Sequence, residues 1–162
     1  MLVVMGVSGS GKTTVAALLA GRLGWEFGDA DTWHSPASVA KMHGGTPLTD
    51  EDRWPWLASI AAWIDATRAT RRHGVLACSA LRRAYRDVLV GQRPDVRLVY
   101  LQGSHTLISE RQAARRNHYM PASLVESQFA TLEPPGLDEH PITVPVAPPA
   151  HDVVQIIMSA LA

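Results

Sequence analysis

The residues Gly6-Val7-Ser8-Gly9-Ser10-Gly11-Lys12-Thr13 decide the fold of this 162-residue chain. They match the pattern G-x-x-x-x-G-K-[ST], in which glycines let successive backbone N–H groups surround phosphate oxygens at the start of a helix. An apolar run at residues 2–5 precedes the motif, and an apolar-periodic stretch follows it. We therefore predict a nucleoside-triphosphate site made by these eight residues and Thr14; the alternative is a glycine-rich turn without a ligand. Lys12 should reach the β- and γ-phosphates, and the Thr13 hydroxyl should coordinate Mg²⁺.

Short apolar runs alternate with longer helix-like stretches along the whole chain, which predicts an α/β domain with a parallel sheet over residues 1–162. The expected strands are residues 2–5, 25–28, 75–79, 97–101 and 142–146. Pro145 should place the last of these at a sheet edge. The expected helices are residues 12–23, 49–72, 83–90, 106–116, 121–131 and 150–161. Pro55 should kink the second helix or mark its true start. Residues 133–149 form a proline-rich loop tract.

Composition excludes several classes of protein. The 15 basic and 15 acidic residues balance, although residues 1–116 carry a net charge of +5 and residues 117–162 a net charge of −5. A neutral chain lacks the basic excess of a general nucleic-acid or membrane-surface binder. The single cysteine, Cys78, excludes an internal disulfide, and the apolar runs are too short for a membrane span. No basic leader precedes the first apolar run, so we expect a cytoplasmic protein.

The other motifs narrow the kind of nucleotide-binding protein. No N-K-x-D segment is present to read guanine, and residues 75–79 end in a hydroxyl where a motor ATPase needs a carboxylate. Small-molecule kinases remain. Asp29-Ala30-Asp31 follows the second expected strand, and in an extended segment both carboxylates project to one side. Such a pair can serve Mg²⁺ and accept the proton of an attacking hydroxyl; the alternative is a solvated turn.

Several segments, which follow one another in the same order as in the family, resemble the signatures of bacterial-type gluconate kinases over roughly residues 1–139. The segments are Gly28-Asp29-Ala30-Asp31-Thr32-Trp33-His34-Ser35-Pro36, Lys41-Met42, Gly45-Thr46-Pro47-Leu48-Thr49-Asp50-Glu51-Asp52-Arg53, Cys78-Ser79-Ala80-Leu81-Arg82-Arg83-Ala84-Tyr85-Arg86-Asp87, Val99-Tyr100-Leu101-Gln102-Gly103, Glu110-Arg111, Arg115, His118, Met120-Pro121 and Ser127-Gln128-Phe129-Ala130-Thr131-Leu132-Glu133. The resemblance implies a P-loop fold with a five-stranded parallel sheet, similar to nucleoside monophosphate kinases, with a helical lid and often a homodimer. It implies phosphorylation of D-gluconate at its 6-hydroxyl by Mg·ATP. Another small P-loop kinase, with a shikimate-like acceptor, and a nucleotide-binding module without catalysis stay open as alternatives.

A sugar acid offers one carboxylate and several hydroxyls. We expect Arg53 and Arg82 to hold the carboxylate, since a guanidinium can bind it through two parallel hydrogen bonds. Asp31 should orient the 6-hydroxyl and accept its proton, while Asp29 helps with Mg²⁺. His34, Ser79 and Gln128 are further substrate candidates. Solvated surface positions are the alternative for each arginine.

Arg111 and Arg115 lie four residues apart, which predicts one helical face. In related kinases such a face belongs to a lid, here about residues 106–131. By resemblance Arg111 lies near adenine and Arg115 approaches the transferring phosphate; the alternative is a solvated basic helix. Trp33, beside the carboxylate pair, is a candidate wall of the sugar pocket.

Overall fold

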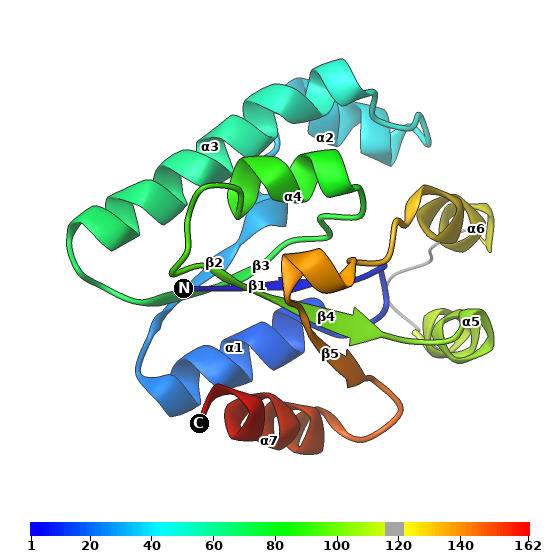
Figure 1. The fold of residues 1–162 in the computed structure, drawn as a ribbon. Coiled ribbons are helices and arrows are strands. Elements are labelled where there is room, and N and C mark those ends of the chain that lie inside the picture. The colour runs from blue at the N-terminus through cyan, green and yellow to red at the C-terminus, as the bar shows by residue number, and fades with distance from the viewer. Residues whose placement is uncertain (116–121) are drawn as a thin grey trace.

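The computed structural model describes residues 1–115 and 122–162. Five parallel strands form one sheet in the order β2-β3-β1-β4-β5 (Figure 1). The strands are β1 (Leu2–Met5), β2 (Glu26–Asp29), β3 (Gly74–Ala77), β4 (Arg97–Gln102) and β5 (Ile142–Pro145). All five expected strands are present, with bounds shifted by one or two residues at most of their ends. Pro145 lies on the edge strand β5, as predicted.

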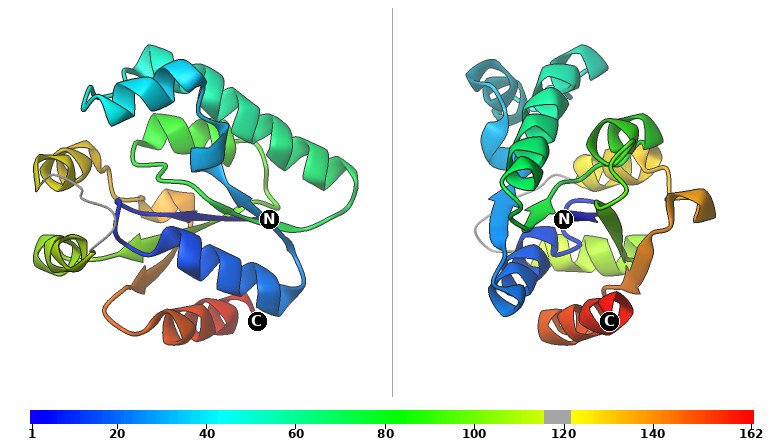
Figure 2. Two further views of the ribbon diagram at one scale, coloured as in Figure 1. Left: turned by 180° about the vertical axis from the view of Figure 1, so that it is seen from behind. Right: turned by 60° about the vertical axis from the view of Figure 1, so that its left-hand side comes forward.

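Helices cover both faces of the sheet. They are α1 (Lys12–Leu23), α2 (Pro36–His43), α3 (Asp50–Ala69), α4 (Arg83–Leu89), α5 (His105–Ala114), α6 (Ala122–Thr131) and α7 (Ala150–Leu161), with short 3₁₀ turns η1 (Ala30–Trp33) and η2 (Leu137–Glu139). Figure 2 shows α1 and α7 on one face and α3 and α4 on the other. Helices α5 and α6 lie side by side beyond the ends of the central strands (Figures 1 and 2). None of the helices in the described ranges is long and apolar enough to cross a membrane.

The core is divided by the sheet into two apolar layers. Leu2 and Val4 pack with α1 and α7, whereas Val3 and Met5 pack with α3 and α4. Successive side chains of a strand point to opposite faces. Because helices cover both faces, the whole of β1 is buried, as its continuous apolar run predicts.

Two helix predictions need correction. Helix α3 begins at Asp50, so Pro55 lies inside it and does not mark its start. Thr49 and Asp52 form a capping box that fixes this start five residues before the proline. Helix α2 was not predicted, although Ser35 caps it and Pro36 occupies its first turn, which is an ordinary start signal. Its eight residues carry too weak an apolar period to stand out.

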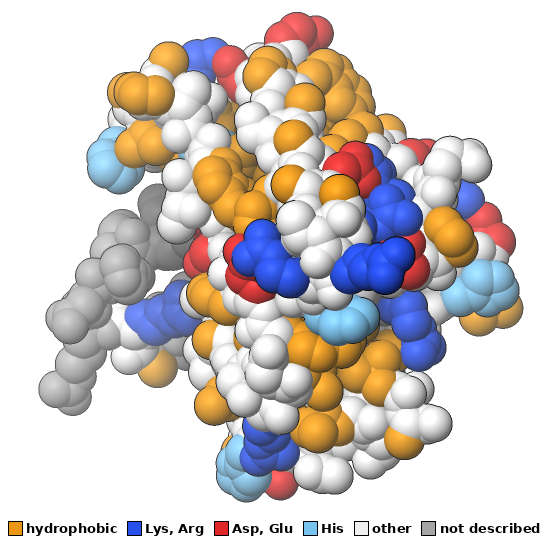
Figure 3. Space-filling model, turned by 90° about the vertical axis from the view of Figure 1, so that its left-hand side faces the viewer, with side chains coloured by type: hydrophobic (Ala, Val, Ile, Leu, Met, Phe, Trp, Pro, Cys, Tyr) orange, Lys and Arg blue, Asp and Glu red, His pale blue; other side chains and the backbone are white. Residues whose placement is uncertain are grey.

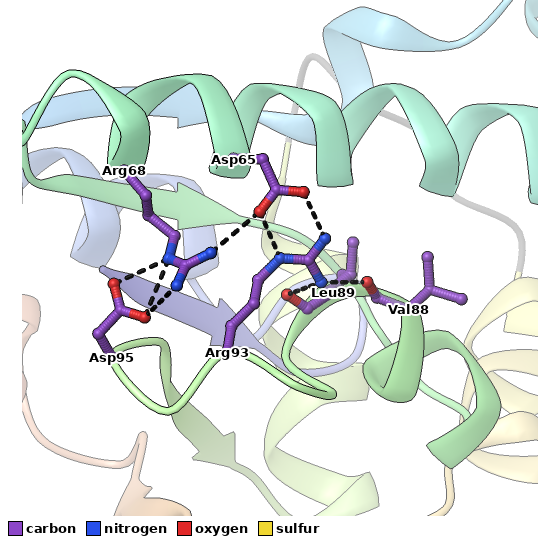
Figure 4. Close-up of polar contacts among 6 residues, drawn as sticks. All are labelled: Asp65, Arg68, Val88, Leu89, Arg93 and Asp95. Atoms are coloured by element: carbon purple, nitrogen blue, oxygen red, sulfur yellow. Dashed lines mark hydrogen bonds and ion pairs between the residues drawn. The ribbon is translucent and has the colours of Figure 1, made fainter.

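The end of the molecule where the strands begin carries charged side chains among apolar ones. In the view of that end in Figure 3, basic and acidic side chains lie next to one another in a band across the middle. Figure 4 shows two acid–base pairs that join α3 to the loop before β4: Arg93 to Asp65 at 2.7 Å and Arg68 to Asp95 at 2.6 Å. Arg68 also contacts Asp65 at 3.1 Å, so the four residues form one network.

Candidate active site

The glycine-rich motif forms the turn between β1 and α1. Gly9 and Gly11 have φ of 89° and 90°, values that favour glycine. A Cβ on Gly6 would lie 2.8 Å from the Leu101 carbonyl oxygen, so the loop also needs a residue without a side chain there. Gly11 is the N-cap of α1 and supplies no side-chain cap. The first N–H groups of α1 are therefore left for an anion, and the partial positive charge of the helix end favours phosphate.

Lys12 is the cation of this loop. Its Nζ donates to the Val7 carbonyl at 3.0 Å, which holds the side chain along the loop. Burial lowers the pKa of Lys12, while the negative charges of Asp31 and Asp29 act in the opposite direction. The Ser10 hydroxyl is buried and has no hydrogen-bond partner among residues 1–115 and 122–162. An unpartnered hydroxyl costs free energy, so an oxygen-rich ligand suits this loop.

The two carboxylates after β2 are arranged differently from the prediction. Asp29 ends β2, but Asp31 lies in the 3₁₀ turn η1, so extended geometry does not place the two side chains. Instead, Asp29 Oδ1 accepts from the Asp31 N–H at 3.1 Å, and its other oxygen accepts from Thr13 Oγ1 at 3.3 Å. Both carboxylates lie close enough to act on Lys12. The Thr13 hydroxyl and the Asp29 carboxylate make a pair of oxygen donors that suits Mg²⁺.

A cavity of about 180 Å³ opens beside the start of α1. Ser10, Gly11 and Thr14 line one side, and Arg111, Val146 and residues 148–150 line the other. The Arg111 Nη2 donates to the Val146 carbonyl, which fixes the guanidinium at this wall. The mostly apolar cavity next to the phosphate loop has the position and character of a nucleoside site.

Arg115 lies at the end of α5. The helix ends at Ala114, and Arg115 is its C-cap with φ −76° and ψ 108°, so the chain leaves the helical path after Arg115. The positive charge of Arg115 contributes to the lowered pKa of Lys12, so the two groups lie near each other. Arg116, His118, Met120 and Pro121 lie outside the described residues.

Helices α5 and α6 contact the phosphate loop directly. Gln128 Oε1 accepts from the Ser8 N–H at 3.0 Å, and Gln112 Nε2 donates to the Ser8 hydroxyl at 3.3 Å. A Cβ on Gly9 would lie 2.7 Å from the Gln112 amide, which shows how closely α5 approaches. Gln128, predicted from the sequence as a substrate residue, thus lies at the phosphate side of the site.

His34 links the carboxylates to Arg53. Its ring stacks on Trp56 with centroids 4.3 Å apart, and Trp56 donates to the Ala30 carbonyl at 2.7 Å. Burial lowers the pKa of His34; the negative charge of Asp31 opposes this shift and the positive charge of Arg53 adds to it. His34 Nδ1 is buried without a partner in the described part of the chain. The imidazole therefore has hydrogen-bonding capacity left for a ligand.

Arg53 and Arg82 come together around Tyr85, although 29 positions separate them in the sequence. Their guanidinium carbons lie 5.7 and 6.0 Å from the centroid of the Tyr85 ring. Asp50 completes the group: its Oδ1 accepts from the Tyr85 hydroxyl at 2.5 Å, and its Oδ2 lies 3.3 Å from Arg82 Nη1. Arg53 donates to the Leu48 carbonyl at 2.6 Å. We call Arg53, Arg82, Asp50 and Tyr85 the arginine cluster.

Ser79 and Cys78 follow β3, next to the phosphate loop. The Ser79 carbonyl accepts from the Gly6 N–H at 3.4 Å, so the two loops touch. Burial raises the pKa of the Cys78 thiol to about 12, which makes it an inert core residue. Trp33 packs on Trp63 with centroids 5.5 Å apart.

Three residues of the site were missed in the sequence. An aspartate such as Asp50 is ordinary in the first turn of a helix, and aromatic residues such as Tyr85 and Trp56 are ordinary in a core. The signal that could have found Asp50 and Tyr85 is their place inside the segments that also carry Arg53 and Arg82. Nothing local distinguishes Trp56 from the other tryptophans, because its role depends on the stacking of His34.

Several known proteins are similar to this chain in sequence and in structure. The family model described as an AAA domain matches residues 1–135. A gluconokinase from Gluconobacter oxydans (strain 621H) is 51% identical over 143 residues, which are 88% of this chain and 80% of that protein. The crystal structure of a gluconokinase from Sinorhizobium meliloti 1021 has a TM-score of 0.89 and 42% identity, with 99% of this chain and 90% of that chain covered. A sugar kinase from Janibacter sp. HTCC2649 gives a TM-score of 0.92 and 47% identity, covering 99% and 92% of the two chains. Because identity of this degree extends over most of both chains, the chain belongs to the gluconokinase family.

Proposed function

We propose that this protein transfers the γ-phosphoryl group of ATP to the 6-hydroxyl of D-gluconate, giving 6-phosphogluconate and ADP. The observation that carries the proposal is the arrangement of Lys12, Asp31, His34 and Arg53. Asp31 lies close enough to act on the pKa of both Lys12 and His34, and Arg53 acts on that of His34, so Asp31 lies between the phosphate loop and the arginine cluster. Membership of the gluconokinase family supports the substrate.

ATP would bind along α1. Its phosphates meet the N–H groups at the start of α1 and the ammonium of Lys12. The cavity between Thr14, Arg111 and residues 148–150 takes the adenosine. Arg111 then contacts adenine through a guanidinium that Val146 already holds in place.

Mg²⁺ fits the donors that this chain presents next to Lys12. We assign it to the Thr13 hydroxyl and the Asp29 carboxylate, because these oxygens lie 3.3 Å apart at the end of the phosphate loop. The remaining ligands would be phosphate oxygens and water, as is usual for Mg²⁺. When bound, the ion supplies positive charge that neutralises the phosphate oxygens during transfer.

Arg53 and Arg82 would bind the gluconate carboxylate, and His34 and Ser79 its hydroxyls. Gln128, which lies at the phosphate side, would contact the end that carries the 6-hydroxyl. This orientation places the 6-hydroxyl toward Asp31. The oxygen of that hydroxyl forms the new bond to the γ-phosphorus, the bond to the ADP oxygen breaks, and the hydroxyl proton passes to the Asp31 carboxylate. Positioning and charge supply most of the rate in such transfers, so Asp31 needs no strongly raised pKa.

Helices α5 and α6 act as the lid, within a single kinase domain over residues 1–162. The contacts of Gln112 and Gln128 with Ser8 support this role, since they join both helices to the phosphate loop. Arg115 then approaches the transferring phosphate from the end of α5. Exclusion of water by the lid prevents hydrolysis of ATP in place of transfer.

We also propose a homodimer, as the family resemblance implies, in the cytoplasm. Light scattering on the purified protein measures the mass directly, and a monomer mass at micromolar concentration would contradict the dimer.

Parallel measurements of ATP consumption separate this function from its alternatives. The acceptors are D-gluconate, related sugar acids, shikimate and nucleoside monophosphates, each at the same concentration. We expect gluconate to give turnover far above the acceptor-free rate. Turnover with shikimate alone would identify another small-molecule kinase. If none of the acceptors raised ATP consumption above the acceptor-free rate, the protein would be a nucleotide-binding module without catalysis.

A further inference from the structure

The turn that carries Arg82 is strained. Ala80 lies between β3 and α4 with a φ of 45°, a conformation that residues with a side chain rarely adopt. Ala80 is buried, so the turn cannot relax into solvent. Such a conformation persists only where surrounding contacts hold it. The contacts that hold this turn therefore fix the position of the Arg82 backbone, from which its side chain extends.

Glu133 contacts the chain on both sides of Arg82. Its backbone N–H donates to the Leu81 carbonyl at 2.8 Å, and its side-chain Oε2 accepts from the Arg83 N–H at 2.7 Å. Arg82 is the N-cap residue of α4 but makes no capping bond with its own side chain. Glu133 thus caps α4 from 50 positions further along the chain. A carboxylate also suits the positive end of a helix.

A buried ion pair holds the same turn from the other side. Arg86 Nη1 donates to the carbonyls of Ala80 and Leu81 at 3.0 and 3.2 Å. The Arg86 side chain is 2% exposed and binds both oxygens of Glu139, at 2.6 and 2.9 Å. Residues 133–139 therefore fix residues 80–83. Since Glu133 lies two residues after α6, this segment also joins the lid helix to the turn.

We infer that Glu133 is a positioning residue that sets Arg82 for the acceptor carboxylate. The inference rests on the proposed function, because it takes Arg82 to be an acceptor contact. Glu133 itself does not reach the arginine cluster; it acts by fixing the backbone from which Arg82 reaches Asp50 and Tyr85. Loss of the cap removes one of the contacts that hold the Arg82 backbone, without changing the phosphate loop. Affinity for the acceptor should fall while affinity for ATP is kept.

The test compares Glu133→Ala with Glu133→Gln and a matched control, Asp138→Ala. Asp138 lies in the same segment and pairs with the Arg83 side chain at the surface, 62% exposed, where an ion pair contributes little. We expect Glu133→Ala to raise the KM for gluconate by about two- to thirtyfold, the range given by loss of a helix cap. The KM for ATP should stay within about twofold. Glu133→Gln keeps an oxygen acceptor and should restore most of the affinity, and Asp138→Ala should match the wild type.

Hydrogen exchange without any acceptor gives a second readout. The amides of residues 82–85 should exchange faster in Glu133→Ala than in the wild type or Asp138→Ala, while amides of β1 and β4 stay unchanged. Unchanged exchange at residues 82–85, or an equal rise of both KM values, would overturn the inference. A wild-type enzyme without gluconate-dependent turnover would instead defeat the proposed function and, with it, the acceptor role of Arg82.

Discussion

At the scale of single residues, Asp31 has the most demanding role. It lies in a 3₁₀ turn whose geometry depends on Asp29, because the Asp29 carboxylate accepts the Asp31 N–H. Its charge acts on both Lys12 and His34. The carboxylate therefore stands between the phosphate side and the acceptor side, where a base for the 6-hydroxyl is needed.

Asp31→Asn should lower kcat by about 10²- to 10⁴-fold, the usual contribution of a positioned general base. The amide keeps the shape of the side chain but cannot accept a proton as a carboxylate does. Steady-state assays give kcat, and calorimetric titration gives the affinity for ATP, which should be retained. Near-normal turnover would remove Asp31 from the mechanism.

At the scale of elements, the start of α3 positions half of the arginine cluster. The Thr49 hydroxyl accepts from the Asp52 N–H at 3.2 Å, and Asp52 Oδ2 accepts from the Thr49 N–H at 2.9 Å. Lys41 of α2 binds the same Asp52 carboxylate at 2.8 Å. This capping box fixes the first turn of α3, which carries Asp50 and Arg53. The same contacts that begin the helix also place the cluster.

Thr49→Ala should lower the free energy of unfolding by about 0.5–2 kcal/mol, because one N–H of the first turn loses its partner. Urea unfolding measures the change. Thr49→Ser keeps the hydroxyl and serves as the control, with a stability close to that of the wild type. A Thr49→Ala protein as stable as Thr49→Ser would show that the capping box contributes nothing.

At the scale of the whole molecule, charged pairs join segments that are distant in the sequence. In the network of Figure 4, hydrogen bonds from Arg93 lower the pKa of Asp65 to about 2. Hydrogen bonds from Arg68 lower the pKa of Asp95, and those from Arg86 lower the pKa of Glu139. Unfolding returns each carboxyl to its ordinary pKa, near 4. The folded state therefore binds fewer protons than the unfolded state between about pH 4 and pH 2.

Stability should accordingly be full above about pH 4 and fall as the pH drops toward 2, because depressed carboxyl pKa values stabilise only the ionised form. Asp65→Asn should flatten this fall in a series of thermal melts. Glu110→Gln, which changes an exposed carboxylate on α5 outside the network, should leave the pH profile as in the wild type. Identical profiles for Asp65→Asn and the wild type would exclude Asp65 as a source of acid sensitivity.

Much of the fold follows from local patterns. Continuous apolar runs mark β1 and β3, and the glycine motif marks the turn into α1. Helix α7 has the bounds that its apolar period predicts. Local signals fail where another part of the chain supplies the contact. Asp31 leaves the expected extended geometry because the Asp29 carboxylate accepts its N–H in a 3₁₀ turn.

The sequence by itself determined the phosphate loop, because glycines at fixed spacing and a lysine at a helix start suit the binding of phosphate. It also named the chemical types that a sugar-acid site needs. Only the tertiary structure decided how these groups meet. Tyr85 and Asp50 bring Arg53 and Arg82 together. Glu133, which follows α6, accepts a hydrogen bond from the turn that carries Arg82. Such contacts join residues tens of positions apart, and packing and hydrogen bonding between distant segments leave no periodic trace in the sequence.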